Sequence, residues 1–272
     1  MTSFVTESEL TSPDTHLFIS PHYDDIALSC GGTAALVTEA GNDGVVALLF
    51  GDHPDPGQPM TSFAEQMHRD WGMSADRVIA GRRAEEAEAS RILGLRDLFL
   101  PFKDAIYRGD SYLGDDDLFG MPKKPDLELP DQIVAALAAA GFDGSSTRVY
   151  APLASGFHVD HQLAFEAALL LDRAGWDVCF YEDLPYSLLE GRVSDRVSRA
   201  GTPLQATELV DVSSVWQKKI DAIMAYPSQL EVIFGQYVGA GSSRVEIDAV
   251  MSAYSKEAGD GRNAERFWRI AD

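Results

Sequence analysis

Short apolar runs alternate along the chain with longer stretches in which apolar residues recur every three or four positions. The apolar runs predict buried strands at 16–20, 44–51, 96–102, 147–153 and 177–186. The longer stretches predict helices at 26–41, 74–94, 130–141, 161–175 and 213–226. Strands that are apolar on both faces and separated by helices indicate a mostly parallel sheet covered on both sides. We therefore predict an α/β fold, a Rossmann-like three-layer sandwich, in a single domain spanning residues 1–272.

Two polar clusters directly follow predicted strands. The first strand is followed by "PHYDD" (21–25), and the fourth by "GFHVDH" (156–161). In open parallel sheets ligands bind beyond the carboxyl ends of the strands, so we expect the active site at this edge. If the two strands are neighbours, the clusters converge in space. The stretches 52–73 and 103–129 are too long for simple connections, and we expect them to form walls or lids over the crevice.

The clusters contain side chains of the types that form catalytic metal sites. Histidine nitrogens and carboxylate oxygens bind zinc, which keeps an open position in catalytic sites. His22 and Asp25 are three residues apart at a strand-to-helix turn, where both can face one ion, and His161 can complete the set. Asp24, His158 and Asp160 then remain for proton transfer, for hydrogen bonding to an oxyanion and for supporting roles.

Simpler interpretations compete with some of these assignments. Two aspartates after a strand are, taken alone, more typical of a helix N-cap, and Asp25 can serve as both cap and ligand. Gly31 and Gly32 are not part of a GxGxxG or GxxxxGK[ST] motif, so they predict close helix packing rather than a phosphate site. Ser155 lacks a GxSxG context, which argues against a serine hydrolase. Arg82, on a predicted helix rich in glutamate, would by default form surface ion pairs.

The charge balance narrows the range of partners. The chain has 22 basic and 43 acidic residues, a net charge of −21, so binding of nucleic acid through a basic surface is not expected. The two cysteines form no metal or disulfide motif, and the first residues do not resemble a secretory signal. The apolar runs are shorter than the roughly 20 residues needed to span a bilayer. We expect a cytoplasmic protein without a membrane partner, either monomeric or a homo-oligomer.

The sequences of the two clusters resemble the motifs of a known protein family. "PHYDD" followed by "GG", and later "HVDH", resemble the signature pair of the LmbE-like, or PIG-L, zinc-dependent N-deacetylases, which include the GlcNAc-PI de-N-acetylases. The segments "RRAEEAEASRILGL", "DAIYR", "YEDLPY" and "KKIDAIMAYPSQ" are similar to later parts of the family pattern, so the resemblance extends from about residue 16 to 268. One departure is Tyr23, where the commoner "HPDDE" form has proline, and it suggests a different substrate pocket.

The resemblance implies a role for each site residue. It implies metal ligands at His22, Asp25 and His161, a general base at Asp24, an electrophile or general acid at His158 supported by Asp160, and substrate contacts at Arg82 and Asp104. The implied cofactor is Zn²⁺, although Fe²⁺ or another divalent metal can occupy such a set.

The implied reaction removes the N-acetyl group of an N-acetylated sugar, a GlcNAc-type glycoside or a related natural product, and releases acetate and an amine. Two alternatives stay open. One is hydrolysis of another N-acyl substrate, such as an acyl glycopeptide. The other is a non-catalytic sugar- or metal-binding protein.

Overall fold

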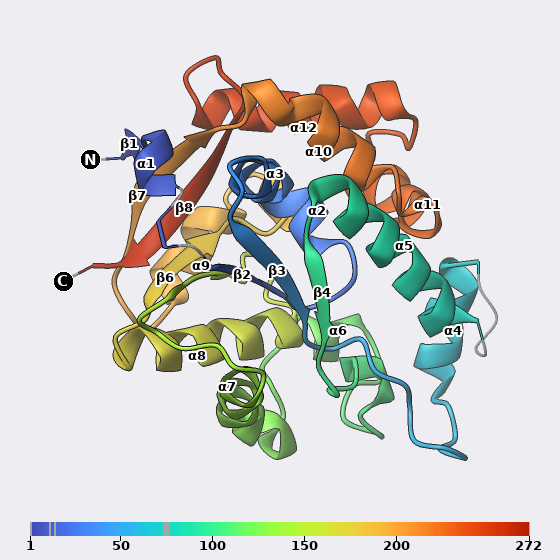
Figure 1. Ribbon diagram of the computed structural model, residues 1–272. Helices are drawn as coiled ribbons and strands as arrows, with labels where there is room; N and C mark the ends of the chain where they lie inside the picture. The colour runs from blue at the N-terminus through green and yellow to red at the C-terminus, as the bar shows by residue number, and fades with distance from the viewer. Residues whose placement is uncertain (1, 11, 14, 73–76, 272) are drawn as a thin grey trace.

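In the part of the chain that the structure describes, eight strands form one sheet in the order β1-β7-β8-β6-β5-β2-β3-β4 (Figure 1). The computed structural model describes residues 2–10, 12–13, 15–72 and 77–271. The strands are β1 (Ser3–Phe4), β2 (Thr15–Ser20), β3 (Asp43–Leu48), β4 (Arg96–Phe99), β5 (Thr147–Pro152), β6 (Asp177–Tyr181), β7 (Leu204–Asp211) and β8 (Ala264–Ile270). Only β8 among these runs antiparallel to its neighbours. The prediction of a mostly parallel sheet is therefore confirmed.

Helices cover both faces of this sheet. The α-helices are α1 (Glu7–Leu10), α2 (Asp25–Ser29), α3 (Gly31–Glu39), α4 (Ser62–Asp70), α5 (Val78–Leu93), α6 (Asp115–Leu118), α7 (Leu129–Ala139), α8 (Val159–Arg173), α9 (Arg192–Arg199), α10 (Trp216–Ile223), α11 (Pro227–Leu230) and α12 (Arg244–Ala258). Shorter 3-10 turns are η1 (Ala105–Tyr107), η2 (Lys124–Glu128), η3 (Tyr186–Leu188) and η4 (Ser213–Val215), and η5 (Glu231–Val238) is a π-helix. In Figure 1, α3, α5, α10 and α12 lie on one side of the sheet, and α7 and α8 on the other. This is the predicted three-layer sandwich.

Alternate residues of the central strands enter two separate cores. In β2, Leu17 and Ile19 pack in the cluster that contains Leu163 of α8, whereas Phe18 packs in the cluster that contains Ala34 of α3. All three β2 side chains are fully buried. Burial on both faces explains why these strands are continuous apolar runs in the sequence.

The predicted helix 26–41 is divided at Cys30 into α2 and α3. Glu265 of β8 stabilises the separate start of α3. Its carboxylate accepts hydrogen bonds from the backbone N–H groups of Gly32 (2.9 Å) and Thr33 (2.7 Å). A Cβ atom on Gly32 would lie 2.6 Å from Cβ of Val212, so only glycine fits there. The interpretation of this glycine pair as a close-packing site is confirmed.

Other differences lie in less apolar parts of the chain. The stretch 52–73, predicted as a loop, contains α4. The first residues of the predicted helix 74–94 lie outside the described residues, and its described part is α5. β7 and β8 were not predicted, because partly exposed side chains interrupt their apolar pattern.

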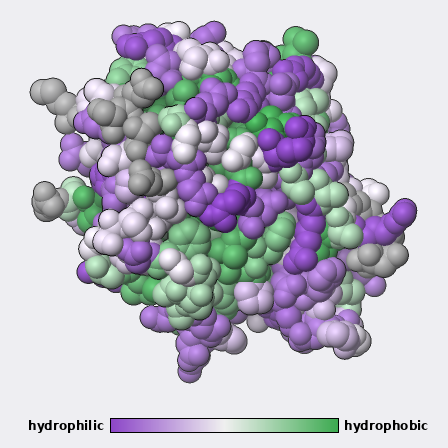
Figure 2. Space-filling model, viewed as in Figure 1, coloured by the Kyte–Doolittle hydropathy of each residue, from purple (hydrophilic) through white to green (hydrophobic). Residues whose placement is uncertain are grey.

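The surface shown in Figure 2 is mostly hydrophilic, in agreement with the large number of charged residues in the sequence. One apolar area lies in the lower middle of this face. Within the part of the chain that the structure describes, no helix has both the length and the apolar character required to cross a bilayer.

Strands β2 and β5 are hydrogen-bonded neighbours. Their register pairs Thr15 with Thr147 and continues to Phe18 with Tyr150. Both strands run in the same direction, so their carboxyl ends, and the polar clusters that follow them, lie side by side at one edge of the sheet.

Candidate metal centre and active site

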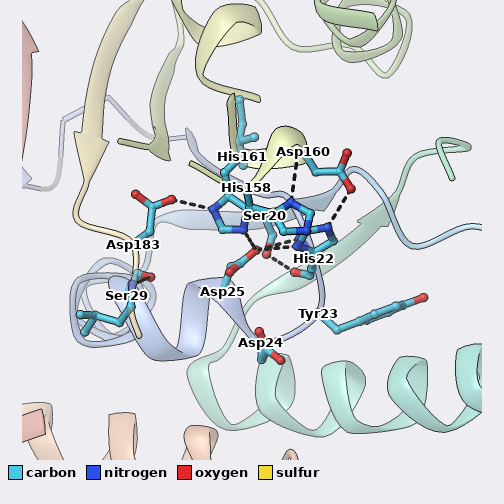
Figure 3. Close-up of polar contacts among 12 residues, drawn as sticks. Ser20, His22, Tyr23, Asp24, Asp25, Ser29, His158, Asp160, His161 and Asp183 are labelled. Carbon is cyan, nitrogen blue, oxygen red and sulfur yellow. Dashed lines mark hydrogen bonds and ion pairs between the residues drawn. The ribbon is translucent and has the colours of Figure 1, made fainter. Parts of the chain in front are cut away.

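The two polar clusters converge as expected. His22 and Asp24 come from the turn between β2 and α2, Asp25 is the first residue of α2, and the second cluster lies at the start of α8 (Figure 3). Asp24 has a φ of 84°, in the left-handed region. This conformation directs Asp25 towards the histidines and Asp24 towards α5. Asp24 occupies the N-cap position of α2, as the simpler interpretation predicts, but its side chain forms no capping hydrogen bond within the described residues.

The residues His22, Asp25 and His161, which we call the candidate metal centre, offer three ligand atoms within 4.8 Å of one another. Oδ2 of Asp25 lies 3.5 Å from Nε2 of His161 and 3.9 Å from Nδ1 of His22. Nε2 of His161 is sealed from solvent and has no hydrogen-bond partner among the residues that the structure describes. A buried polar atom of this kind requires an explanation, and a cation between these three side chains supplies one.

Each imidazole of the candidate metal centre is held by a carboxylate on its other nitrogen. Nδ1 of His161 lies 2.6 Å from Oδ1 of Asp183, and Nε2 of His22 lies 2.9 Å from Oδ2 of Asp160. Such carboxylates are typical partners of metal-binding histidines, because they fix the tautomer and the ring orientation. The donor set therefore fits a divalent cation.

A second group of possible ligands, His22, His158 and Asp160, fits a cation less well. Oδ1 of Asp160 lies 2.5 Å from Nη2 of Arg108, and Oδ2 also accepts a hydrogen bond from the backbone N–H of Ala105 at 3.0 Å. Burial raises the pKa of Asp160, but Arg108 and His22 outweigh it and hold the pKa well below its usual range. The charge of this carboxylate is thus already balanced by an arginine.

The contacts of Asp160 correct one expectation. Its carboxylate is hydrogen-bonded to His22 and Arg108, and among the described residues it forms no hydrogen bond to the His158 ring, although it lies within 4.8 Å of a nitrogen of that ring. Only its backbone N–H contacts that ring, donating to Nδ1 of His158 at 3.2 Å. Burial and the nearby His22 lower the pKa of His158 well below its ordinary value.

Asp24 lies beside buried charged groups of α5. Its Oδ2 is 3.4 Å from Nη2 of Arg82, and its backbone N–H donates to Glu86 at 3.2 Å. Burial raises the pKa of Asp24 to about 7 against the opposing effect of Arg82. Arg82 lies over the rings of Tyr23 and Trp71, at 5.0 and 4.9 Å from their centroids. It is therefore a buried group, and the surface-ion-pair alternative is wrong.

A cavity of about 540 Å³ opens above these residues. Its lining includes Asp24, Arg82, Asp104 and His158, and it is walled by both long stretches predicted to surround the crevice. Those stretches contribute Met67, Asp70, Trp71, Ile106, Asp115, Leu118 and Phe119. Further walls come from Tyr186 and from the η5 residues Val232, Ile233, Gln236 and Tyr237. Tyr23 lies under Arg82 and donates a hydrogen bond to the carbonyl of Gly51 at 2.7 Å, so it shapes the pocket only indirectly.

Three polar residues of the site were not predicted. Asp183 follows β6, the neighbour of β5, so the same strand-end argument that selected the two clusters could have identified it. Glu86 and Arg108 lie on a helix and in a loop, where no local pattern distinguishes them from surface residues.

The family model described as PIG-L, GlcNAc-PI de-N-acetylase, matches residues 17–171, more than half of the 272-residue chain. The chain belongs to the PIG-L family. The PIG-L match includes every predicted site residue, whereas Asp183 and Tyr237 lie beyond it.

Relatives of this PIG-L protein are deacetylases by name. This chain is 34% identical over 189 residues to the 2'-N-acetylparomamine deacetylase of Niallia circulans, and the aligned region covers 62% of this chain and 66% of that protein. It is 32% identical over 219 residues to the enzyme of the same name from Streptomyces fradiae, covering 79% and 73%. The chain thus spans about two thirds to three quarters of these relatives. The solved A40926 pseudoaglycone deacetylase is similar with a TM-score of 0.71 and 26% identity, over 96% of this chain and 98% of that one.

Proposed function

We propose that this PIG-L protein hydrolyses the acetamide of an N-acetylated amino sugar and releases acetate and a free amine. The observation that carries the proposal is the unpaired, buried Nε2 of His161, which faces Asp25 beside the cavity. The family and the names of its relatives support the same reaction.

A divalent metal is part of the proposal. His22, Asp25 and His161 would hold it, and Zn²⁺ suits a set of two imidazoles and one carboxylate, although Fe²⁺ can bind the same ligands. When bound, such an ion polarises an amide carbonyl and makes a water molecule more acidic.

Asp24 is the proposed general base. Its carboxylate lines the cavity next to the candidate metal centre and is oriented by Arg82, 3.4 Å away. From this position it can accept a proton from the attacking water and return it to the departing amine. A positioned base of this kind contributes about 10²–10⁴ in rate.

His158 is the proposed hydrogen-bond donor to the amide oxygen. Because its Nδ1 accepts the backbone N–H of Asp160, the neutral ring carries its proton on Nε2. The ring lines the cavity, so that N–H can stabilise the negative charge that develops on the oxygen.

The cavity walls suggest which sugars fit. Phe119 and Tyr237 are 38% and 37% exposed and present aromatic faces of the kind on which sugar rings pack. Asp70, Asp104 and Asp115 add carboxylates, while Arg82 is the one lysine or arginine among the described lining residues. A substrate with additional ammonium groups would be attracted to such walls. This favours an amino sugar like those named for the two bacterial relatives.

A glycopeptide is the second candidate substrate. The 26% identity to the A40926 pseudoaglycone deacetylase, over nearly the whole chain, favours a substrate larger than a simple amino sugar. The apolar wall of Val232 and Ile233 would suit its aromatic or acyl groups.

Acetate release tests the proposal directly. The protein is depleted of metal with a chelator, reloaded with Zn²⁺ and assayed with N-acetylated aminoglycosides, GlcNAc glycosides and N-acyl glycopeptides. We expect turnover only after reloading, and a loss of about 10²–10⁴ in kcat for Asp24→Asn. Turnover that persists after complete metal removal would contradict the metal-dependent mechanism. Binding of sugars without any acetate release would favour the non-catalytic alternative.

A further inference from the structure

A buried arginine lies behind the candidate metal centre. Arg108 follows η1, and its guanidinium carbon lies 5.3 Å from the ring centroid of Phe50 and 5.2 Å from that of Tyr112. Its side chain is only 11% exposed. A charged group between two rings has lost most of its water, so it depends on fixed polar partners.

Three polar groups hold the guanidinium from different directions. Nη2 lies 2.5 Å from Oδ1 of Asp160, and Nη1 donates to the carbonyl of Lys103 at 2.9 Å. Nε lies 3.1 Å from Oδ2 of Asp126 as an ion pair, without a hydrogen-bond partner among the described residues. Arginine has a planar array of donors that can engage several acceptors at once, which a lysine ammonium cannot reproduce. The position of Arg108 is therefore closely defined.

Asp126 is itself fixed. It is buried, and the hydroxyl of Tyr112 donates to its Oδ2 at 2.6 Å. That hydroxyl also accepts the backbone N–H of Lys123 at 2.9 Å. The far side of Arg108 is thus paired with a carboxylate that is hydrogen-bonded within the segment 103–129, and a displacement of Arg108 would separate this ion pair.

On its other side Arg108 is connected through Asp160 to His22, a residue of the candidate metal centre. Both oxygens of Asp160 are occupied, Oδ1 by Arg108 and Oδ2 by Nε2 of His22 at 2.9 Å and by a backbone N–H (Figure 3). A carboxylate that accepts at Nε2 requires the proton to be on that nitrogen. The lone pair of Nδ1 is then directed to the side of Asp25, 3.9 Å away.

We propose that Arg108, held by Asp126, is a positioning residue that fixes Asp160 and thereby the orientation and tautomer of His22 for metal binding. The inference rests on the metal-dependent function proposed above. It assigns a task to two residues that touch neither the cavity nor the ion. Groups that orient metal ligands in this way typically change metal affinity or activity about 10- to 100-fold when they are replaced.

The chain offers a matched control. Arg148 in β5 is also a buried arginine with two carboxylates, Asp177 at 3.1 Å and Glu208 at 3.2 Å, and it donates to the carbonyl of Glu9 at 3.0 Å. It lies near the amino end of its strand, away from the site. Replacing it breaks a comparable ion-pair network without affecting His22.

The experiment measures Zn²⁺ affinity of metal-depleted protein by competition with a chromophoric chelator. We expect Arg108→Met to weaken binding about 10- to 100-fold. Arg108→Lys should restore part of this loss, because it returns the charge without the planar array. Asp126→Asn should weaken binding less than Arg108→Met, and Arg148→Met should lower the unfolding temperature but leave Zn²⁺ affinity unchanged.

The outcomes separate this inference from the proposed function. Wild-type protein that binds no Zn²⁺ would overturn both. Wild-type binding together with wild-type affinity in Arg108→Met would overturn the positioning role alone. If Arg108→Met does not fold, Asp126→Asn decides the question, and unchanged affinity in that variant overturns the role. An equal loss of affinity in Arg148→Met would also overturn it, because a general loss of stability would then explain the effect.

Discussion

Nδ1 of His161 lies 2.6 Å from a carboxylate oxygen of Asp183, and both side chains are buried. Asp183 comes from the loop after β6, one strand beyond the strand that precedes His161. The pair explains why Nε2 of His161 is free to bind an ion. The proton is retained on Nδ1, where Asp183 accepts it.

Asp183→Asn should therefore weaken Zn²⁺ binding by about 10- to 100-fold while the fold is retained. Direct titration of metal-depleted protein measures the change. Asp177→Asn, at the other end of β6, is the control and should bind Zn²⁺ normally. Wild-type affinity in a folded Asp183→Asn protein would show that this carboxylate does not orient the ligand.

Asp70 and Asp115 should select substrates by charge. Replacing each with asparagine should raise KM about 2- to 5-fold for an N-acetylated aminoglycoside that has free ammonium groups, since exposed ion pairs are worth little. KM for a neutral GlcNAc glycoside should stay constant, and added salt should reduce the difference. Steady-state kinetics with both substrates test this, with Asp131→Asn on α7 as a control outside the cavity. Equal changes for charged and neutral substrates would contradict charge selection.

Lys219 should be important for stability. Its Nζ lies 2.6 Å from Glu265, the carboxylate that caps α3, and both groups are buried. Lys219→Met leaves that carboxylate without its cation and should cost about 3–5 kcal/mol in free energy of unfolding. The adjacent Lys218 forms a more exposed pair with Glu39 at 2.9 Å, so Lys218→Met should cost less than about 1 kcal/mol. Urea denaturation compares the two, and similar values would argue against the capping role.

Glu86 should make stability depend on pH. Burial raises its pKa from 4.5 to about 8, with Tyr226 as a hydrogen-bond donor and Asp24 and Asp97 as nearby carboxyls. The folded state binds this proton more tightly than the unfolded chain. The stabilising contribution is therefore complete below pH 4.5 and is lost as the pH rises through 8.

Glu86→Gln resembles the protonated form and should remove this decline. The variant should be more stable than wild type above pH 8, by on the order of a few kcal/mol, and the advantage should vanish near pH 4. Denaturation curves measured across this range test the prediction. Glu88→Gln, on the same helix but exposed, should show no such rise. A pH-independent difference for Glu86→Gln would mean that its carboxyl group keeps an ordinary pKa.

The strands that position the site could be predicted because they are buried on both faces. β2 and β5 show this as short runs of consecutive apolar residues, Leu17–Ile19 and Val149–Ala151. Their adjacency was the condition for convergence of the two clusters and was not itself predicted. The break at Cys30 could not be predicted, since the carboxylate that caps α3 comes from Glu265, far away in the sequence. The ion pair of Asp160 with Arg108 could not be predicted either, because Arg108 lies in a segment without a periodic pattern.

Because β2 and β5 are adjacent, the distance between the two chain segments that carry the candidate metal centre is set by the spacing of two strands inside the sheet. The cavity walls, in contrast, belong to segments outside the sheet, so they can be lengthened, shortened or exchanged between relatives without moving the ligands. Substrate preference and metal binding can thus change independently. Transplanting the segment 231–238 from one relative into another should transfer substrate specificity and leave metal affinity unchanged.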